Sequence, residues 1–205
     1  MSQHPLDQAA LRARPPIDAI IVGASAGGVE AMLSLFRHLP PHYRLPIIAA
    51  LHMQEMRDSL LADLFQHYVA FEVKEAQDKE AIQGSTLYFA CPGYHLSIEQ
   101  SRQFSLSCEP PLHFSRPAID YLMESAADAY GEHLAGILLT GANEDGAAGL
   151  QKIRQAGGLT IVQDPAEAVA DTMPLSAIKL DPGHLVLELG KIQQLLIALG
   201  EQHVH

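Results

Sequence analysis

Basic residues and cysteines are scarce in this sequence. The chain has 13 lysines and arginines against 24 aspartates and glutamates, which gives a formal net charge of -11. An acidic surface repels phosphate backbones, so we expect no nucleic acid among the partners. Two cysteines, Cys91 and Cys108, are too few for a disulfide framework. The expected location is therefore a reducing cytoplasm.

Long apolar runs are also absent. No stretch reaches the roughly 18 apolar residues of a membrane span, and residues 1–14 lack the apolar core of a signal peptide. We therefore expect no membrane insertion. The 205 residues are 48% hydrophobic and 18% charged, which is typical of one globular domain. We expect a flexible leader over residues 1–16, one folded domain over 17–200 and a tail over 201–205.

Apolar, β-rich runs alternate with helical patterns along most of the chain. The expected strands are 17–22, 46–51, 134–139 and 159–162, and the expected helices are 29–39, 59–68, 115–130, 147–155, 174–180 and 191–199. This alternation predicts an α/β fold with a doubly wound, mostly parallel sheet and helices on both faces. Short runs at 71–74, 86–90, 94–98 and 104–107 predict antiparallel strands or hairpins, as a small insertion.

Three reactive side chains follow three of the expected strands. Ser25 follows the first strand, His52 the second, and Asp145 the strand over 134–139. Ligands of open α/β sheets bind beyond the carboxyl ends of the strands, where these side chains would meet. A serine hydroxyl needs a neighbouring base, histidine supplies one near neutral pH, and a buried carboxylate orients the imidazole. The pattern predicts a serine hydrolase with Ser25, His52 and Asp145 as catalytic residues.

Each of these residues also has a simpler interpretation. Ser25 could be a turn or cap residue, His52 a hydrogen-bonded strand-end histidine, and Asp145 the cap of a helix that begins at residue 146 or 147. Only their convergence favours catalysis. The small residues of segment 23–28 would leave room for a substrate, and free N–H groups at the following helix could bind an oxyanion.

Other site chemistries fit the sequence poorly. The glycines of segment 23–28 match neither G-x-G-x-x-G nor G-x-x-x-x-G-K-[ST]. A G-x-S-x-G elbow is present, but the α/β-hydrolase order of serine, acid, histidine is not. There is no H-E-x-x-H motif and no paired cysteine spacing, so we expect neither a metal nor a cofactor. His113 precedes a proline-rich turn and could face a substrate, but receives no role.

Several ordered motifs resemble the catalytic domain of the CheB family, the chemotaxis protein-glutamate methylesterases. They are the nucleophile segment 21–28, the Q-H-M-like segment 51–53, the R-P-S-x-D-like segment 116–120, the L-T-G-M-G-x-D-G-A-like segment 138–147, and the shorter matches 156–158, 163–164 and 173–174. The resemblance covers about residues 17–192. It identifies 17–200 as a CheB-type catalytic domain, with Ser25 as nucleophile, His52 as base and Asp145 as orienting acid.

The resemblance implies hydrolysis of glutamate methyl esters on chemoreceptors in a cytoplasmic signal-transduction system, with release of methanol. For some members it also implies deamidation of receptor glutamines. The expected partner is therefore the cytoplasmic domain of a methylated chemoreceptor or a related sensory protein. Two alternatives stay open at this point. One is a regulatory or binding module of the same fold with weakened catalysis, and the other is a small-molecule esterase.

This chain departs from the family pattern at four places. Leu51 replaces the usual glutamine, Ala142 and Asn143 replace Met-Gly, and residues 54–57 lack the usual P-x-G-F-T-like pattern. A phosphorylatable receiver domain precedes the esterase in well-known members, whereas about 16 residues precede it here. We therefore expect no phosphorylation in cis and an open site. Neither the receptor, the regulator nor the oligomeric state follows from the sequence.

Overall fold

The computed structural model describes residues 14–52 and 60–201, and its centre is a seven-stranded sheet. The strands lie in the order β3-β4-β2-β1-β7-β8-β9, and every pairing between them is parallel. Their bounds are β1 (Ala19–Ala24), β2 (Ile47–Leu51), β3 (Glu72–Glu75), β4 (Thr86–Phe89), β7 (Leu134–Leu138), β8 (Leu159–Gln163) and β9 (Leu185–Leu187). The central strands are buried along their whole length, as expected for a sheet covered on both faces.

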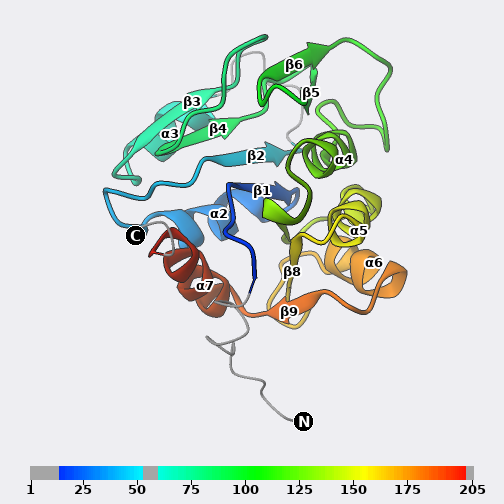
Figure 1. Ribbon diagram of the computed structural model, residues 1–205. Coiled ribbons are helices and arrows are strands. Elements are labelled where there is room, and N and C mark those ends of the chain that lie inside the picture. Colours follow the sequence, from blue (N-terminus) through cyan, green and yellow to red (C-terminus); the bar gives the residue numbers. More distant parts are fainter. Residues whose placement is uncertain (1–13, 53–59, 202–205) are drawn as a thin grey trace.

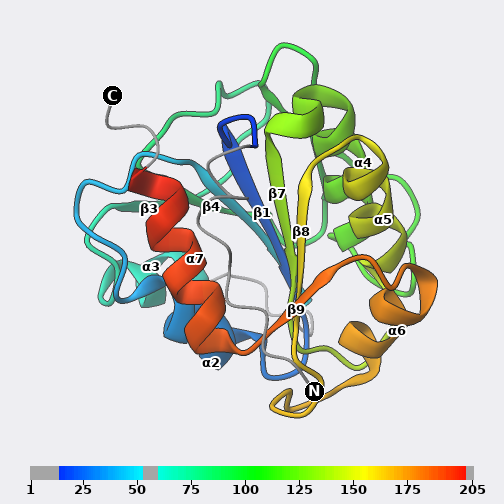
Figure 2. The same cartoon turned by 60° about the horizontal axis from the view of Figure 1, so that its bottom comes forward.

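Helices cover both faces of this sheet (Figures 1 and 2). One face carries α2 (Gly28–Phe36), α3 (Leu61–Gln66) and α7 (Leu189–Glu201), and the other carries α4 (Ile119–Tyr130), α5 (Ala147–Gln155) and α6 (Thr172–Leu180). The predicted doubly wound α/β fold is thus confirmed. None of the described helices is long and apolar enough to cross a bilayer.

Each face of the sheet has its own hydrophobic core. Below α2 and α7 the core includes Phe36 and Phe65, and Phe65 meets Phe89 edge-on at 4.9 Å between ring centroids. Below α4 and α5, the rings of Tyr88 and Phe104 pack in the same way at 4.9 Å. These two cores hold the sheet rigid, so side chains at its edge have a firm support.

The middle of the chain differs from the prediction. The runs at 71–74 and 86–90 form β3 and β4, which pair in parallel and extend the main sheet. The segment between them, 76–85, forms the crossover that a parallel pair needs. Only β5 (His95–Ile98) and β6 (Phe104–Ser107) form the predicted antiparallel hairpin.

The other differences concern where an element begins and two short elements that the sequence did not predict. α4 begins at Ile119 rather than at 115, strand β9 was not predicted, and neither was the short 3-10 helix Gly131–His133. Residues 1–13 of the predicted leader and 202–205 of the predicted tail lie outside the described residues.

The order of the strands determines where a ligand would bind. β1 pairs with β2 on one side and with β7 on the other, so the chain crosses in opposite directions from this central strand. Such a switch point opens a crevice at the carboxyl ends of the strands. Ser25, His52 and Asp145 all follow the carboxyl ends of these three strands.

Candidate active site

His52 and Asp145 form a close and shielded pair. His52 Nε2 lies 2.7 Å from Asp145 Oδ2, with side-chain exposures of 8% and 0%. Because an ionised carboxylate can only accept hydrogen bonds, Nε2 carries the proton and donates it. The remaining ring nitrogen, Nδ1, is then the basic one in the neutral imidazole. This arrangement suits a general base that is oriented by a buried acid.

The start of helix α4 holds Asp145 in place. The Ile119 N–H donates to Oδ2 at 2.7 Å, and the Asp120 N–H donates to Oδ1 at 2.9 Å. Burial by itself raises the pKa of Asp145, but the hydrogen bonds from His52 and from these two N–H groups outweigh it, so that the pKa lies below its usual value. The positive end of the helix dipole also favours the anion. Asp145 therefore caps α4 and not α5, the helix that it was alternatively expected to cap and whose N-cap residue is Gly146.

The side chain of Asp120 binds the first turn of α5. Its Oδ1 accepts a 2.7 Å hydrogen bond from the N–H of Gly149, in the first turn of α5. Asp145, just before α5, thus binds the beginning of α4, and Asp120, in the first turn of α4, binds the beginning of α5. Burial is the main cause that raises the pKa of Asp120 to about 6, and the nearby charge of Asp145 adds to it. The reciprocal contacts lock α4 and α5 together at the site.

Ser25 follows β1, the strand between β2, which ends before His52, and β7, which ends before Asp145. Its N–H donates to the Thr140 carbonyl at 2.9 Å, and the His52 N–H donates to the Ala24 carbonyl at 3.1 Å, so the three strand ends are joined. Within residues 14–52 and 60–201, however, the Ser25 hydroxyl makes no hydrogen bond. The hydroxyl that meets His52 Nδ1 is that of Ser115, at 3.2 Å.

The glycines after Ser25 make room for the protein's own side chains. Gly27 has φ 78°, and a Cβ added there would lie 2.7 Å from Val169 Cβ. A Cβ at Gly28 would lie 2.5 Å from Leu51 Cδ1. The expectation that segment 23–28 is small in order to admit a substrate thus needs revision at these two positions, because glycine is required there by close packing. Leu51, which replaces the family's glutamine, fills the space above Gly28.

Thr140 ties the loop after β1 to its neighbours. Besides accepting the Ser25 N–H, it donates from Oγ1 to the Ala26 carbonyl at 2.8 Å and accepts the Ala170 N–H at 2.9 Å. In the described part of the chain, the N–H groups of Ala26 and Gly27 have no acceptor. These two residues follow Ser25 and precede α2, and their N–H groups are free to donate hydrogen bonds to an oxyanion formed at Ser25.

The replaced Met-Gly dipeptide has a local structural role. Asn143 Oδ1 accepts a 3.3 Å hydrogen bond from the Asp145 N–H, while Ala142 is exposed. The asparagine therefore supports the turn that presents the Asp145 carboxylate. The third departure from the family pattern, residues 54–57, lies outside the described residues.

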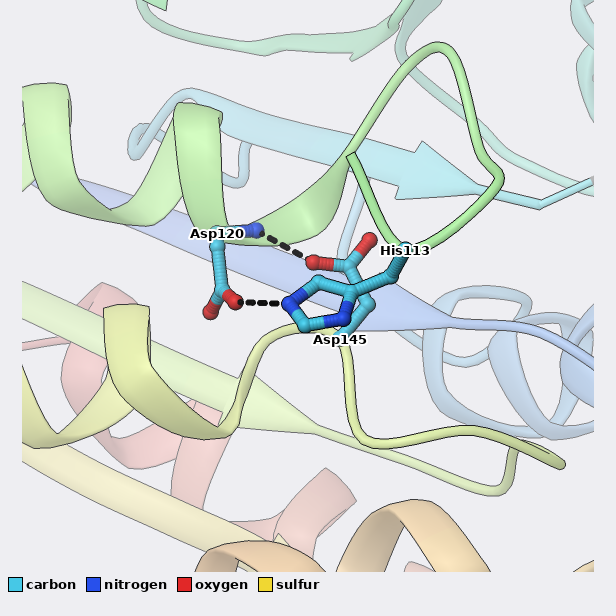
Figure 3. A group of neighbouring side chains, drawn as sticks. All are labelled: His113, Asp120 and Asp145. Carbon is cyan, nitrogen blue, oxygen red and sulfur yellow. Dashed lines mark hydrogen bonds and ion pairs between the residues drawn. The ribbon is translucent and has the colours of Figure 1, made fainter. Parts of the chain in front are cut away.

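A metal centre is the other chemistry to consider here. His113, Asp120 and Asp145 have ligand atoms within 4.8 Å of one another (Figure 3). Both oxygens of Asp145 and Oδ1 of Asp120 already accept N–H donors at the positive ends of two helices. Only Asp120 Oδ2 and His113 are left, and they face each other at 3.4 Å. The donor set therefore suits helix capping better than cation binding.

Sequence reasoning missed three residues of this site: Ser115, Asp120 and Thr140. Asp120 and Thr140 lie inside the family-like motifs 116–120 and 138–147, and this position is the signal by which the sequence could have assigned them to the site. Ser115 had no such signal. The sequence predicts only that a helix begins there, and the contact of Ser115 with His52 spans 63 residues of sequence.

Comparison with known proteins agrees with this geometry. The family model for CheB methylesterase matches residues 20–196. A Leptospira interrogans protein, whose name assigns it to the protein-glutamate methylesterases/protein-glutamine glutaminases, is 41% identical over 91% of this chain and 97% of its own length. The protein-glutamate methylesterase FrzG of Myxococcus xanthus is 35% identical over 92% of this chain and 57% of its own length.

A solved structure gives the same result for the fold. The catalytic domain of Thermotoga maritima CheB methylesterase superposes with a TM-score of 0.85 at 29% identity, and the match covers 90% of this chain and 100% of that one. By sequence, family model and fold, this chain belongs to the CheB methylesterase family.

Proposed function

We propose that this protein is a serine esterase that hydrolyses glutamate methyl esters on the cytoplasmic domain of a chemoreceptor or a related sensory protein. The observation that carries the proposal is the 2.7 Å pair of His52 and Asp145, placed at the strand ends beside Ser25 in a chain of this family. We assign Ser25 as nucleophile, His52 as general base and acid, and Asp145 as the group that orients His52.

In the first half of the reaction, the Ser25 hydroxyl gives its proton to His52 Nδ1 while Oγ bonds to the ester carbonyl carbon. The Ala26 and Gly27 N–H groups, which have no acceptor among the described residues, would donate hydrogen bonds to the oxyanion that forms. The bond to the methoxy group then breaks, and His52 returns the proton, so that methanol leaves. In the second half, water gives a proton to His52 Nδ1 and bonds to the acyl carbon. The bond to Ser25 Oγ then breaks, His52 returns the proton to Ser25, and the glutamate carboxylate is released.

The same steps convert a glutamine side chain to glutamate, with ammonia in place of methanol. Relatives whose names include a protein-glutamine glutaminase support this second activity. The two free cysteines, Cys91 and Cys108, suit the reducing cytoplasm in which such a substrate would be found.

The test is methanol release from a methylated receptor fragment, with the Ser25→Ala variant as blank. Release by the wild-type protein and none above background by Ser25→Ala would support the proposal. A wild-type protein that binds the fragment without releasing methanol would favour the binding module instead. Turnover of small esters with no turnover of the receptor fragment would favour a small-molecule esterase.

A further inference from the structure

The structure places a second serine on the catalytic histidine. Ser115 is half-buried, and its Oγ lies 3.2 Å from His52 Nδ1. Because Nε2 donates to Asp145, Nδ1 of the neutral ring has a lone pair and no proton. The Ser115 hydroxyl is therefore the donor in this contact.

Nδ1 is also the atom that must take the proton of Ser25. One ring nitrogen accepts one strong hydrogen bond, so Ser115 and Ser25 compete for it. In the structure Ser115 holds the position, and Ser25 Oγ has no hydrogen-bond partner among the described residues. The contact thus aligns the imidazole with Asp145 while it withholds the base from the nucleophile.

Ser115 closes a short hairpin with an anchored base. Leu112 and Ser115 exchange both backbone hydrogen bonds, at 3.2 and 2.8 Å. At the base, Arg116 donates to the Cys108 and Glu109 carbonyls, and the His95 ring contacts the Pro110 carbonyl at 3.0 Å. The path of the chain toward His52 is therefore defined.

The tip of this hairpin is strained, and one of its two side chains is unpacked. His113 and Phe114 have φ values of 49° and 61°, which are unusual for bulky residues. The Phe114 side chain is fully exposed, at 103%. Such strain tends to occur at functional sites. His113 contacts the Asp120 and Glu144 carboxylates at 3.4 and 3.6 Å, but residues 112–115 add no side chain to either hydrophobic core. A shift of the tip that releases the Ser115 hydrogen bond therefore moves these polar contacts and leaves both cores in place.

We propose that Ser115 is a positioning residue, which holds His52 in the substrate-free protein and must release Nδ1 before Ser25 can react. The proposal rests on the proposed function, in which Ser25 is the nucleophile. Removing the Ser115 hydroxyl should free the base and speed the reaction of Ser25. The expected gain is about threefold to tenfold, the range that corresponds to the net loss of one hydrogen bond.

The experiment measures the rate at which a fluorophosphonate labels the purified protein, and mass spectrometry locates the labelled serine. The variants are Ser115→Ala, Ser115→Thr, which keeps the hydroxyl, and Ser97→Ala as a control for loss of a half-buried hydroxyl on β5. We expect faster labelling of Ser25 in Ser115→Ala only, with Ser115→Thr and Ser97→Ala near the wild-type rate. Circular dichroism establishes that each variant is folded.

Other outcomes overturn the proposal in distinguishable ways. An unchanged or slower rate in folded Ser115→Ala, with the label still on Ser25, rejects the holding role and leaves the proposed function intact. A label on Ser115 in the wild-type protein rejects both, because Ser115 would then be the nucleophile. No label on either serine in any variant also rejects both.

Discussion

Replacing Asp145 with asparagine tests the buried acid, because the side chain keeps its size and loses its charge. Three donors meet the carboxylate: the His52 ring and the N–H groups of Ile119 and Asp120. An amide has one acceptor oxygen, so at least one of these donors faces an NH₂ group. An unsatisfied buried donor costs about 1–3 kcal/mol, and loss of the charge at the start of α4 costs up to about 2 kcal/mol. We expect the free energy of unfolding to fall by roughly 2–4 kcal/mol.

The activity of Asp145→Asn should fall by far more than its stability explains. The asparagine NH₂ favours the tautomer in which Nε2 accepts and Nδ1 carries the proton, so Nδ1 can no longer take the proton of Ser25. Loss of the orienting acid in serine triads typically lowers kcat about 10⁴-fold. Denaturant unfolding and ester hydrolysis at 25 °C measure the two effects separately.

The matched control is Asp181→Asn. That aspartate accepts a 2.9 Å hydrogen bond from the Gly183 N–H beyond the end of α6 and lies 3.7 Å from Arg154 Nε in a partly exposed ion pair of small expected energy, away from the site. It should change neither quantity appreciably. If Asp145→Asn retained more than about a tenth of the wild-type kcat, the effect would be far below that of a triad acid, and the assigned role of the pair would be refuted.

The stability difference has a defined pH dependence. The pKa of Asp145 lies below its usual value of 3.8 in the folded protein. The ionised group therefore contributes stability above the unfolded pKa, and this contribution is lost as the pH falls through the folded one. The gap between wild type and Asp145→Asn should be constant above about pH 5 and should shrink below about pH 4.

Three further predictions follow from the site. Folding raises the pKa of Asp120 from 3.8 to about 6, so between these pH values the folded protein binds a proton that the unfolded chain has lost. This group therefore lowers the free energy of unfolding of the wild type by up to about 3 kcal/mol as the pH rises from 4 to 6. Denaturant titrations of Asp120→Asn should lack this pH dependence, and an identical dependence in both proteins would refute the assignment. Thr140→Val removes the contacts with Ala26 and Ala170 and should cost about 1–3 kcal/mol of unfolding free energy, whereas Thr140→Ser should keep most of it. The double variant Ser25→Ala, His52→Ala should hydrolyse ester little more slowly than either single variant, because triad members act as a unit; independent, additive losses would contradict a shared step.

The fold was predictable where burial imposes a repeating pattern. The apolar runs before Ser25 and His52 are buried on both faces, and such strands read clearly as members of a parallel sheet. β3 misled the prediction because its pattern is mixed: Glu72 is exposed and Val73 is buried. A short strand at the side of a sheet carries too little apolar sequence to show whether its partner is parallel.

The site was only partly predictable. Strand order brought His52 and Asp145 into contact as expected, but the helix that Asp145 caps begins at Ile119, 26 residues earlier in the chain. The sequence offers only adjacent helices as candidates for a cap, whereas the fold adds helices that are distant in sequence. Ser115 was missed for the same reason, since its position depends on the hairpin that turns it toward His52.

The most direct test of the account is to trap the covalent intermediate. A methyl-ester peptide from a receptor methylation site would be mixed with the enzyme, quenched with acid within milliseconds and digested for mass spectrometry. The account predicts an ester adduct on Ser25, with the mass of the peptide less methanol, that is absent from the Ser25→Ala variant. Methanol release with the adduct on Ser115, or with no adduct on any serine at any quench time, would contradict it.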